Sequence, residues 1–152
     1  MVKKLKLEVK YVPENEVLGL FSGLSDYRLC WFINNSLGLK LSRTTDIALN
    51  PFKSEAPELF SLFIYRDKEL MVDYYLLNNR KDHHLLLPEP KKLDYLLLLK
   101  AKDFRVNIDE TIAKLRKVPQ IATAVWFKQT GKVKNLDRLL YDFEIALIDK
   151  PQ

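Results

Sequence analysis

The stretch Ser25–Leu39, which reads SDYRLCWFINNSLGL, decides how the rest of the chain is interpreted. Ser25 is a favourable N-cap, and Gly38 suits the left-handed conformation that often follows the last turn of a helix. At about 100° per residue, one apolar stripe is formed by Leu29, Cys30, Ile33 and Leu37. We therefore expect a helix that packs on a sheet and buries Cys30.

The side of this helix that faces away from the stripe carries Arg28 and Asn35. In the simplest interpretation, these two residues are the solvent-facing side of a packed helix. In the functional interpretation, they form a polar surface site. Aromatic residues flank them, which suggests a second hypothesis. A small-molecule pocket between the helix and the sheet would use Tyr27, Trp31 and Asn34.

Further elements lie on both sides of this helix in the sequence. Period-two or aromatic-rich runs predict strands at Lys4–Tyr11, Leu59–Arg66, Lys68–Asn78, Leu93–Lys102 and Gln120–Phe127. Helical spacing predicts two more helices, at Ile108–Lys117 and Asn135–Leu147. The segment Glu16–Leu24 fits either a helix or a short strand, because its apolar spacing is helical but two glycines weaken a helix.

This order of elements predicts a single α+β domain over residues 1–152. We expect a mainly antiparallel sheet of about five strands, with helices packed on one face. A ferredoxin-like variant with a C-terminal helix is the favoured arrangement.

The other face of the predicted sheet is unusually apolar. It would place Met71, Tyr75, Leu96 and Leu98 in water. Because exposed apolar patches usually mark contacts, either the C-terminal helix or a second copy of the chain must cover this face. These four residues are therefore the predicted interface of a homodimer.

Composition bounds the chemistry. The formal charge of +5 is spread along the chain, and the four glycines form no phosphate-binding pattern. The single cysteine excludes an internal disulfide and favours a cytoplasmic location. His83 and His84 are adjacent in a loop, a poor arrangement for joint binding of one metal ion. We predict no catalytic, cofactor-binding or metal-binding residue, and no membrane span.

Nucleic-acid binding is the alternative function. Phe63, Tyr65 and Tyr75 could stack on bases if they faced outward from the sheet. Two carboxylates, Asp73 and Asp94, would share that face and repel phosphates. Nucleic-acid-binding proteins usually concentrate their positive charge on one face. In this chain the Lys and Arg residues are instead spread along the sequence.

The residues that precede and begin the central helix resemble a known family. VPENEV at Val12–Val17, followed by Asp26–Trp31 and Asn34, is similar to a small bacterial family with an IPExxVD signature. Val12 replaces the isoleucine of that signature, and Leu18 stands where it has aspartate. The resemblance implies a bacterial cytoplasmic protein and, since the family has no established activity, it transfers no site residues.

The sequence therefore predicts a non-enzymatic domain that acts through protein contacts. Its expected partner is a second copy or another protein. Nucleic-acid binding and a small-molecule pocket remain the alternatives.

Overall fold

The structure, a computed structural model, describes residues 15–88, 93–103, 105–128 and 130–150. The strand predicted at Lys4–Tyr11 lies outside these residues. The elements in chain order are β1 (Asn15–Phe21), α2 (Asp26–Leu37), β2 (Ser42–Arg43), β3 (Ile47–Leu49), β4 (Glu58–Phe60), β5 (Leu62–Asp67), β6 (Val72–Asn78), β7 (Arg80–Lys81), β8 (His84–Leu85), β9 (Tyr95–Lys100), α3 (Ile108–Arg116), β10 (Thr123–Trp126), η1 (Thr130–Lys132) and α4 (Leu136–Asp149). The predicted α+β class is confirmed.

The central sheet has six strands in the order β10-β1-β9-β6-β5-β2, and every neighbouring pair is antiparallel. Four of the six, β5, β6, β9 and β10, correspond to predicted strands. The other two are β1, from the segment that could not be assigned, and the short β2, which pairs with Ile64 and Phe63 of β5. Two separate hairpins, β3–β4 and β7–β8, lie outside this sheet.

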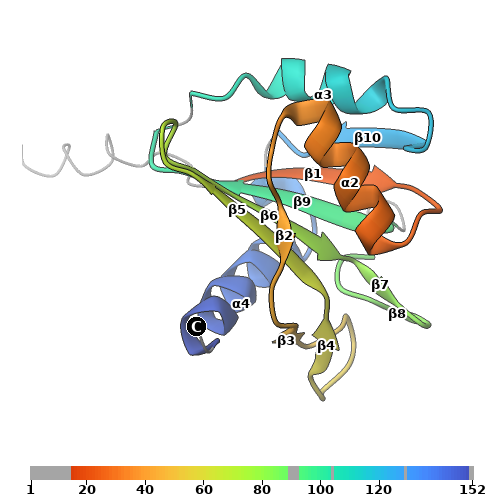
Figure 1. Ribbon diagram of the computed structural model, residues 1–152. Helices are drawn as coiled ribbons and strands as arrows, with labels where there is room; N and C mark the ends of the chain where they lie inside the picture. The colour runs from red at the N-terminus through yellow and green to blue at the C-terminus, as the bar shows by residue number, and fades with distance from the viewer. Residues whose placement is uncertain (1–14, 89–92, 104, 129, 151–152) are drawn as a thin grey trace, which may run out of the picture.

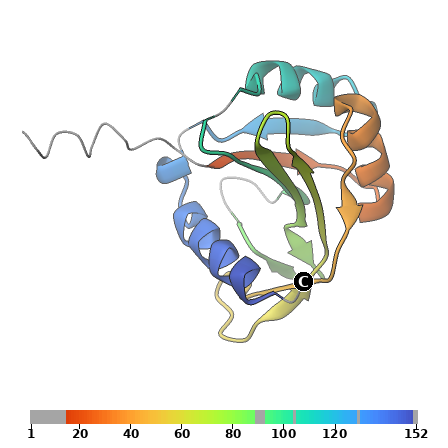
Figure 2. The same ribbon diagram turned by 60° about the vertical axis from the view of Figure 1, so that its left-hand side comes forward.

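Helices cover both faces of the sheet (Figures 1 and 2). Side chains of β9 alternate between two apolar clusters: Leu97 and Leu99 enter the cluster that includes α2 and α3, while Leu96 and Leu98 enter the cluster that includes α4. The expectation that helices pack on one face was wrong, because α4 returns to the opposite face. Of the two alternatives named for covering the apolar face, the C-terminal helix and a second copy of the chain, the structure shows the helix.

The ambiguous segment Glu16–Leu24 contains strand β1. Val17, Leu18 and Leu20 are all fully buried, because consecutive side chains of a strand covered on both faces enter two different cores. Gly19 is required by a close approach: a Cβ atom at this position would lie 2.4 Å from Cδ1 of Leu93. The second glycine, Gly23, lies after the strand and not within it.

The central helix forms as predicted. α2 begins after Ser25, and Gly38 ends it with a left-handed φ of 68°. Leu29, Cys30 and Ile33 are its buried residues. The Asp26 carboxylate also lies 2.7 Å from the Ser61 hydroxyl, which ties the start of α2 to the neighbouring strands.

The other predicted elements are confirmed with somewhat different bounds, except that the strand predicted at Leu59–Arg66 is divided between β4 and β5. The apolar runs around Asp67 form the hairpin β5–β6, whose turn ends at Met71 with a left-handed φ of 58°. Asn107 caps α3, since its side chain accepts a hydrogen bond from the Glu110 amide at 3.0 Å. The C-terminal helix extends past the predicted Leu147 to Asp149.

The described residues include no helix that is both long and apolar enough to cross a membrane.

Candidate interaction surfaces on two helices

The four residues predicted to form an exposed interface are separated by the structure. Tyr75, Leu96 and Leu98 are buried, with at most 4% of each residue exposed. The reason is α4, whose Phe143 ring meets the Tyr75 ring edge-on at 5.2 Å. That interface prediction is therefore wrong for these three residues, because a helix far along the chain already covers them. Met71 alone of the four is exposed, at 70%.

The aromatic sheet surface expected for nucleic acid is also covered. Phe63 and Tyr75 are buried on opposite faces of the sheet. Tyr65 is half-buried and stacks on Tyr74, with 6.1 Å between the ring centroids. In the described part of the chain, these strands therefore present no row of exposed aromatic rings on which bases could stack. Nucleic-acid binding through this sheet surface is not supported.

The predicted pocket residues have different environments. Asn34 turns toward the loop that follows α2: its Nδ2 donates to the Leu41 carbonyl at 3.1 Å, and its Oδ1 accepts from the Leu41 amide at 2.9 Å. Tyr27 and Trp31 instead project into solvent. Asn34 therefore holds the chain after the helix, and the pocket hypothesis is wrong in grouping it with the two aromatic residues.

The structure brings the remaining predicted residues together on one surface. We call this surface the α2 outer face, and it consists of Tyr27, Arg28, Trp31 and Asn35. All four are exposed, because the opposite side of α2 packs in the core. Tyr27 is 62% exposed and Trp31 60% exposed, which is high for side chains of this size. The polar pair and two of the pocket residues thus belong to a single site.

Neighbouring side chains hold Tyr27 in place. Its ring meets the ring of Phe63 edge-on, with centroids 5.6 Å apart. The guanidinium of Arg43 lies 5.8 Å from both ring centroids. Arg43 is in turn paired with Asp46. Tyr27 is therefore exposed on one side while its ring contacts Phe63 and Arg43 on the other.

Trp31 has a comparable arrangement. Its ring packs edge-on against Phe32, with centroids 5.0 Å apart. Its backbone carbonyl accepts a hydrogen bond from Nδ2 of Asn35 at 2.9 Å. Arg28, one helical turn away, forms no ion pair with any described residue. A cation is therefore available beside an exposed aromatic ring.

A second exposed surface lies on α4 and was missed by the sequence analysis. We call it the α4 outer stripe: Tyr141, Ile145 and Ile148. Spacings of four and three residues place these side chains on one side of a helix. Tyr141 is 67% and Ile148 76% exposed, while the other side of α4 is in the core. Helical spacing alone could have revealed this stripe within the predicted C-terminal helix.

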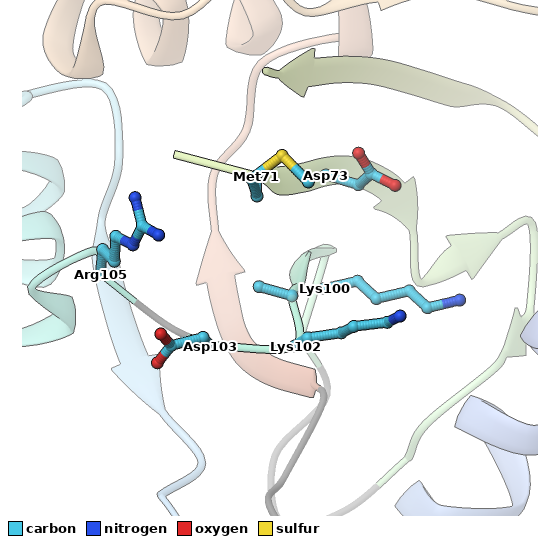
Figure 3. A pocket seen from close by; sticks show the side chains of 7 residues that line it. Met71, Asp73, Lys100, Lys102, Asp103 and Arg105 are labelled. Atoms are coloured by element: carbon cyan, nitrogen blue, oxygen red, sulfur yellow. The ribbon is translucent and has the colours of Figure 1, made fainter. Parts of the chain in front are cut away.

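A wide hollow of about 580 Å³ lies where β6 begins and β9 ends (Figure 3). Its lining is Met71, Asp73, Lys100, Ala101, Lys102, Asp103 and Arg105. Lys100 and Lys102 extend in one direction and Arg105 lies on the other side of the hollow (Figure 3). Lys100 pairs with Glu144 of α4, and Asp73 approaches Arg66 at 3.9 Å. The charges here do not converge on one point.

Cys30 and His84, two groups with catalytic potential, are engaged in structural contacts. Burial raises the pKa of the Cys30 thiol to about 11, against the smaller lowering effect of its hydrogen bond from Asn34. A thiol that keeps its proton at neutral pH is a poor nucleophile. His84 contacts the Glu58 carboxylate through Nδ1 at 2.6 Å. Within the described ranges, no three His, Cys, Asp or Glu residues are arranged to hold a metal ion.

Comparisons with known proteins leave the fold and site to be judged on their own geometry. No family model, curated protein or solved structure matches the chain. The resemblance to the IPExxVD family therefore stays a prediction.

Proposed function

We propose that this chain is a protein-binding domain and that the α2 outer face is its contact surface. The observation that carries the proposal is that Tyr27 and Trp31 are both more than half exposed while each packs edge-on against a neighbouring aromatic ring. Tyr, Trp and Arg are the residue types that most often dominate the binding energy of protein interfaces. Arg28 supplies the third of these types on the same surface.

Ordered aromatic side chains favour binding for an entropic reason. An exposed side chain that becomes fixed in an interface loses about 0.5–1.5 kcal/mol of rotamer freedom. Tyr27 already contacts Phe63 and Arg43, and Trp31 already contacts Phe32, so part of this cost is met in the free protein. The exposed area of two large rings remains available to a partner.

The charge beside these rings indicates the chemistry of the partner. Arg28 is exposed and forms no ion pair in the described part of the chain, and the whole chain carries a formal charge of +5. Complementary charge speeds association and selects among partners. The partner is therefore a protein surface with apolar side chains flanked by carboxylates.

Photo-cross-linking in cells tests the proposal. A photoreactive phenylalanine analogue replaces Trp31, and the adducts of the full chain are identified by mass spectrometry. We expect a discrete adduct with an acidic protein, and we expect Arg28→Glu to remove it. Ala113, exposed on α3, is the matched control position. Equal adducts at both positions would overturn the proposal.

Affinity measurements with the purified adduct partner give the second test. Trp31→Ala should weaken binding by about 30-fold, the equivalent of a hot-spot loss of about 2 kcal/mol. Ala113→Ser should leave the Kd unchanged. Unaltered binding by Trp31→Ala would also contradict the proposal.

We also infer that the protein is a bacterial cytoplasmic one with a ferredoxin-like core. The free and buried thiol of Cys30 supports a reducing compartment. Four adjacent strands, β10-β1-β9-β6, follow a chain order β1, α2, β6, β9, α3, β10 once the strands between α2 and β6 are set aside. That order agrees with the β-α-β-β-α-β pattern.

A further inference from the structure

We infer that α4 pairs antiparallel with α4 of a second copy of the chain, across a two-fold axis near Ile145. The α4 outer stripe supplies the apolar contact. Such a pairing goes beyond the proposed function, because it uses a different helix on the opposite face of the sheet (Figures 1 and 2).

The first argument is that α4 is apolar on two sides. One side enters the core through Leu136, Leu139, Leu140 and Phe143. The stripe of Tyr141, Ile145 and Ile148 contributes nothing to that core, yet it remains apolar and exposed. A helix with apolar residues on opposite sides is typically covered on both.

The second argument is charge complementarity, which selects a second copy as the occupant. Arg138 lies near the start of α4 and Asp149 at its end, and helical geometry places both on the same flank of the stripe. With the axis near Ile145, Arg138 of each copy lies about 4.5 Å along the helix from the level of Asp149 of the other, so its long side chain can reach that carboxylate. A parallel pair would instead place Arg138 of one copy level with Arg138 of the other, and Asp149 level with Asp149. The charge pattern is thus self-complementary, as a two-fold interface requires.

Neither charge is committed to a strong contact within the chain. Arg138 approaches Asp142 at 3.7 Å in an exposed pair, which contributes little to stability. Asp149 is exposed and forms no ion pair with a described residue. Both are therefore free to pair with the second copy.

A shallow hollow lies beside the stripe and could receive a side chain of the second copy. It lies between α4 and the β3–β4 hairpin, has a volume of about 320 Å³, and is lined by Ile47, Ala48, Leu59, Ala146, Asp149 and neighbouring polar groups. Leu59 is exposed at 55% and extends the apolar surface. Tyr141 of the second copy faces Ile148 and Asp149 in the antiparallel arrangement.

The resulting interface is small. Stable interfaces bury about 1,200–2,000 Å² in total, and one helix pair with three apolar residues from each copy falls toward the low end. The dimer is therefore expected to dissociate on dilution. Each copy still presents its α2 outer face, so dimerisation would make binding of a clustered partner bivalent.

Sedimentation equilibrium and light scattering on the full chain test the inference. We expect the mass to rise from 17.9 kDa toward twice that value as the protein concentration increases. Ile145→Asp should abolish the rise, because two carboxylates would meet at the two-fold axis. Ala113→Asp adds the same charge at an exposed position of α3 and should leave dimerisation unchanged.

A charge swap tests the orientation of the pair. Arg138→Glu and Asp149→Arg should each raise the dimer Kd about 5-fold or more, as expected when like charges replace an interfacial ion pair. The double variant should restore the wild-type Kd, since the pair is only inverted. A wild-type chain that stays monomeric up to millimolar concentration overturns the inference. Failure of the double variant to recover the Kd also overturns the antiparallel arrangement.

The two proposals fail separately. Variants of α4 should change the mass without changing the intrinsic affinity of each chain for the α2 partner. Variants of the α2 outer face should do the reverse.

Discussion

α2 and α4 each bury one side in a core on opposite faces of the same sheet, and each leaves large apolar side chains exposed on the other side. The exposed rings of α2 rest on neighbouring side chains, as Tyr27 does on Phe63. On α4, Tyr141 has no ring contact among the described residues, and aliphatic residues continue its stripe. One surface is aromatic and ordered, and the other is a linear aliphatic stripe.

This difference separates two kinds of contact. A cluster of ordered aromatic rings beside an arginine suits a heterologous partner, because a few residues can then supply most of the binding energy. A linear stripe flanked by opposite charges at its two ends suits another helix, above all an identical one. The sheet lies between the two surfaces, so a partner could occupy each independently (Figure 1).

The largest expected effect contrasts the two sides of α4. Phe143→Ala removes a buried ring that packs on Tyr75, and it should lower the free energy of unfolding by about 3–5 kcal/mol. Tyr141→Ala, on the exposed side, should change the stability of the monomer by no more than about 0.5 kcal/mol. Urea denaturation at low protein concentration measures both. Equal losses would contradict the assignment of inner and outer sides.

The next effect tests how tightly the α4 side of the sheet is filled. Gly19→Ala would press a Cβ atom against the fully buried Leu93, and overpacking of this kind costs about 1–3 kcal/mol. Gly23→Ala is the matched control, since nothing lies within 4 Å of its Cβ position. We expect Gly23→Ala to be neutral or slightly stabilising. Thermal unfolding of both variants would show the difference, and a stabilising Gly19→Ala would refute the close approach.

A smaller effect distinguishes the adjacent asparagines of α2. Asn34→Ala removes two hydrogen bonds to the Leu41 backbone, each with a net contribution of about 0.5–1.5 kcal/mol. Asn35→Ala loses only an exposed bond to the Trp31 carbonyl and should leave stability nearly unchanged. Denaturant titration of the two variants checks the order. If Asn35→Ala were the more damaging, the boundary of the α2 outer face would be wrong.

A further effect concerns pH and the buried side of α2. Because the folded state raises the pKa of Cys30 from 9.0 to about 11, its stabilising contribution is complete below pH 9 and is lost as the pH rises through 11. The free energy of unfolding of the wild type should therefore fall more over this interval than that of Cys30→Ala. Parallel pH slopes for the two proteins would contradict the burial of this thiol.

Much of the fold could be predicted from local patterns. The end of α2 follows from Gly38, whose left-handed conformation depends only on adjacent backbone, whereas Ser25 occupies the N-cap position without a side-chain capping hydrogen bond. The cap at Asn107 likewise depends only on adjacent backbone. The segment around Gly19 could not be assigned, because its strand is buried on both faces and its apolar residues do not alternate.

The candidate sites were less predictable. Arg28, Asn35, Tyr27 and Trp31 could be singled out by type and by helical spacing, but their division into two sites was incorrect. The interface on the sheet was misplaced because the exposure of Leu96 and Leu98 depends on α4, about forty residues later in the chain. The α4 outer stripe was visible in the spacing of its residues and was overlooked.

The sequence by itself determined α2, α3 and α4, four of the six strands of the central sheet and the α+β class, because periodicity and helix-terminating signals act between neighbouring residues. Only the tertiary structure decided which apolar surfaces remain in water. Whether a residue such as Tyr75 or Ile148 is exposed depends on where distant segments pack, and α4 buries the first while it displays the second.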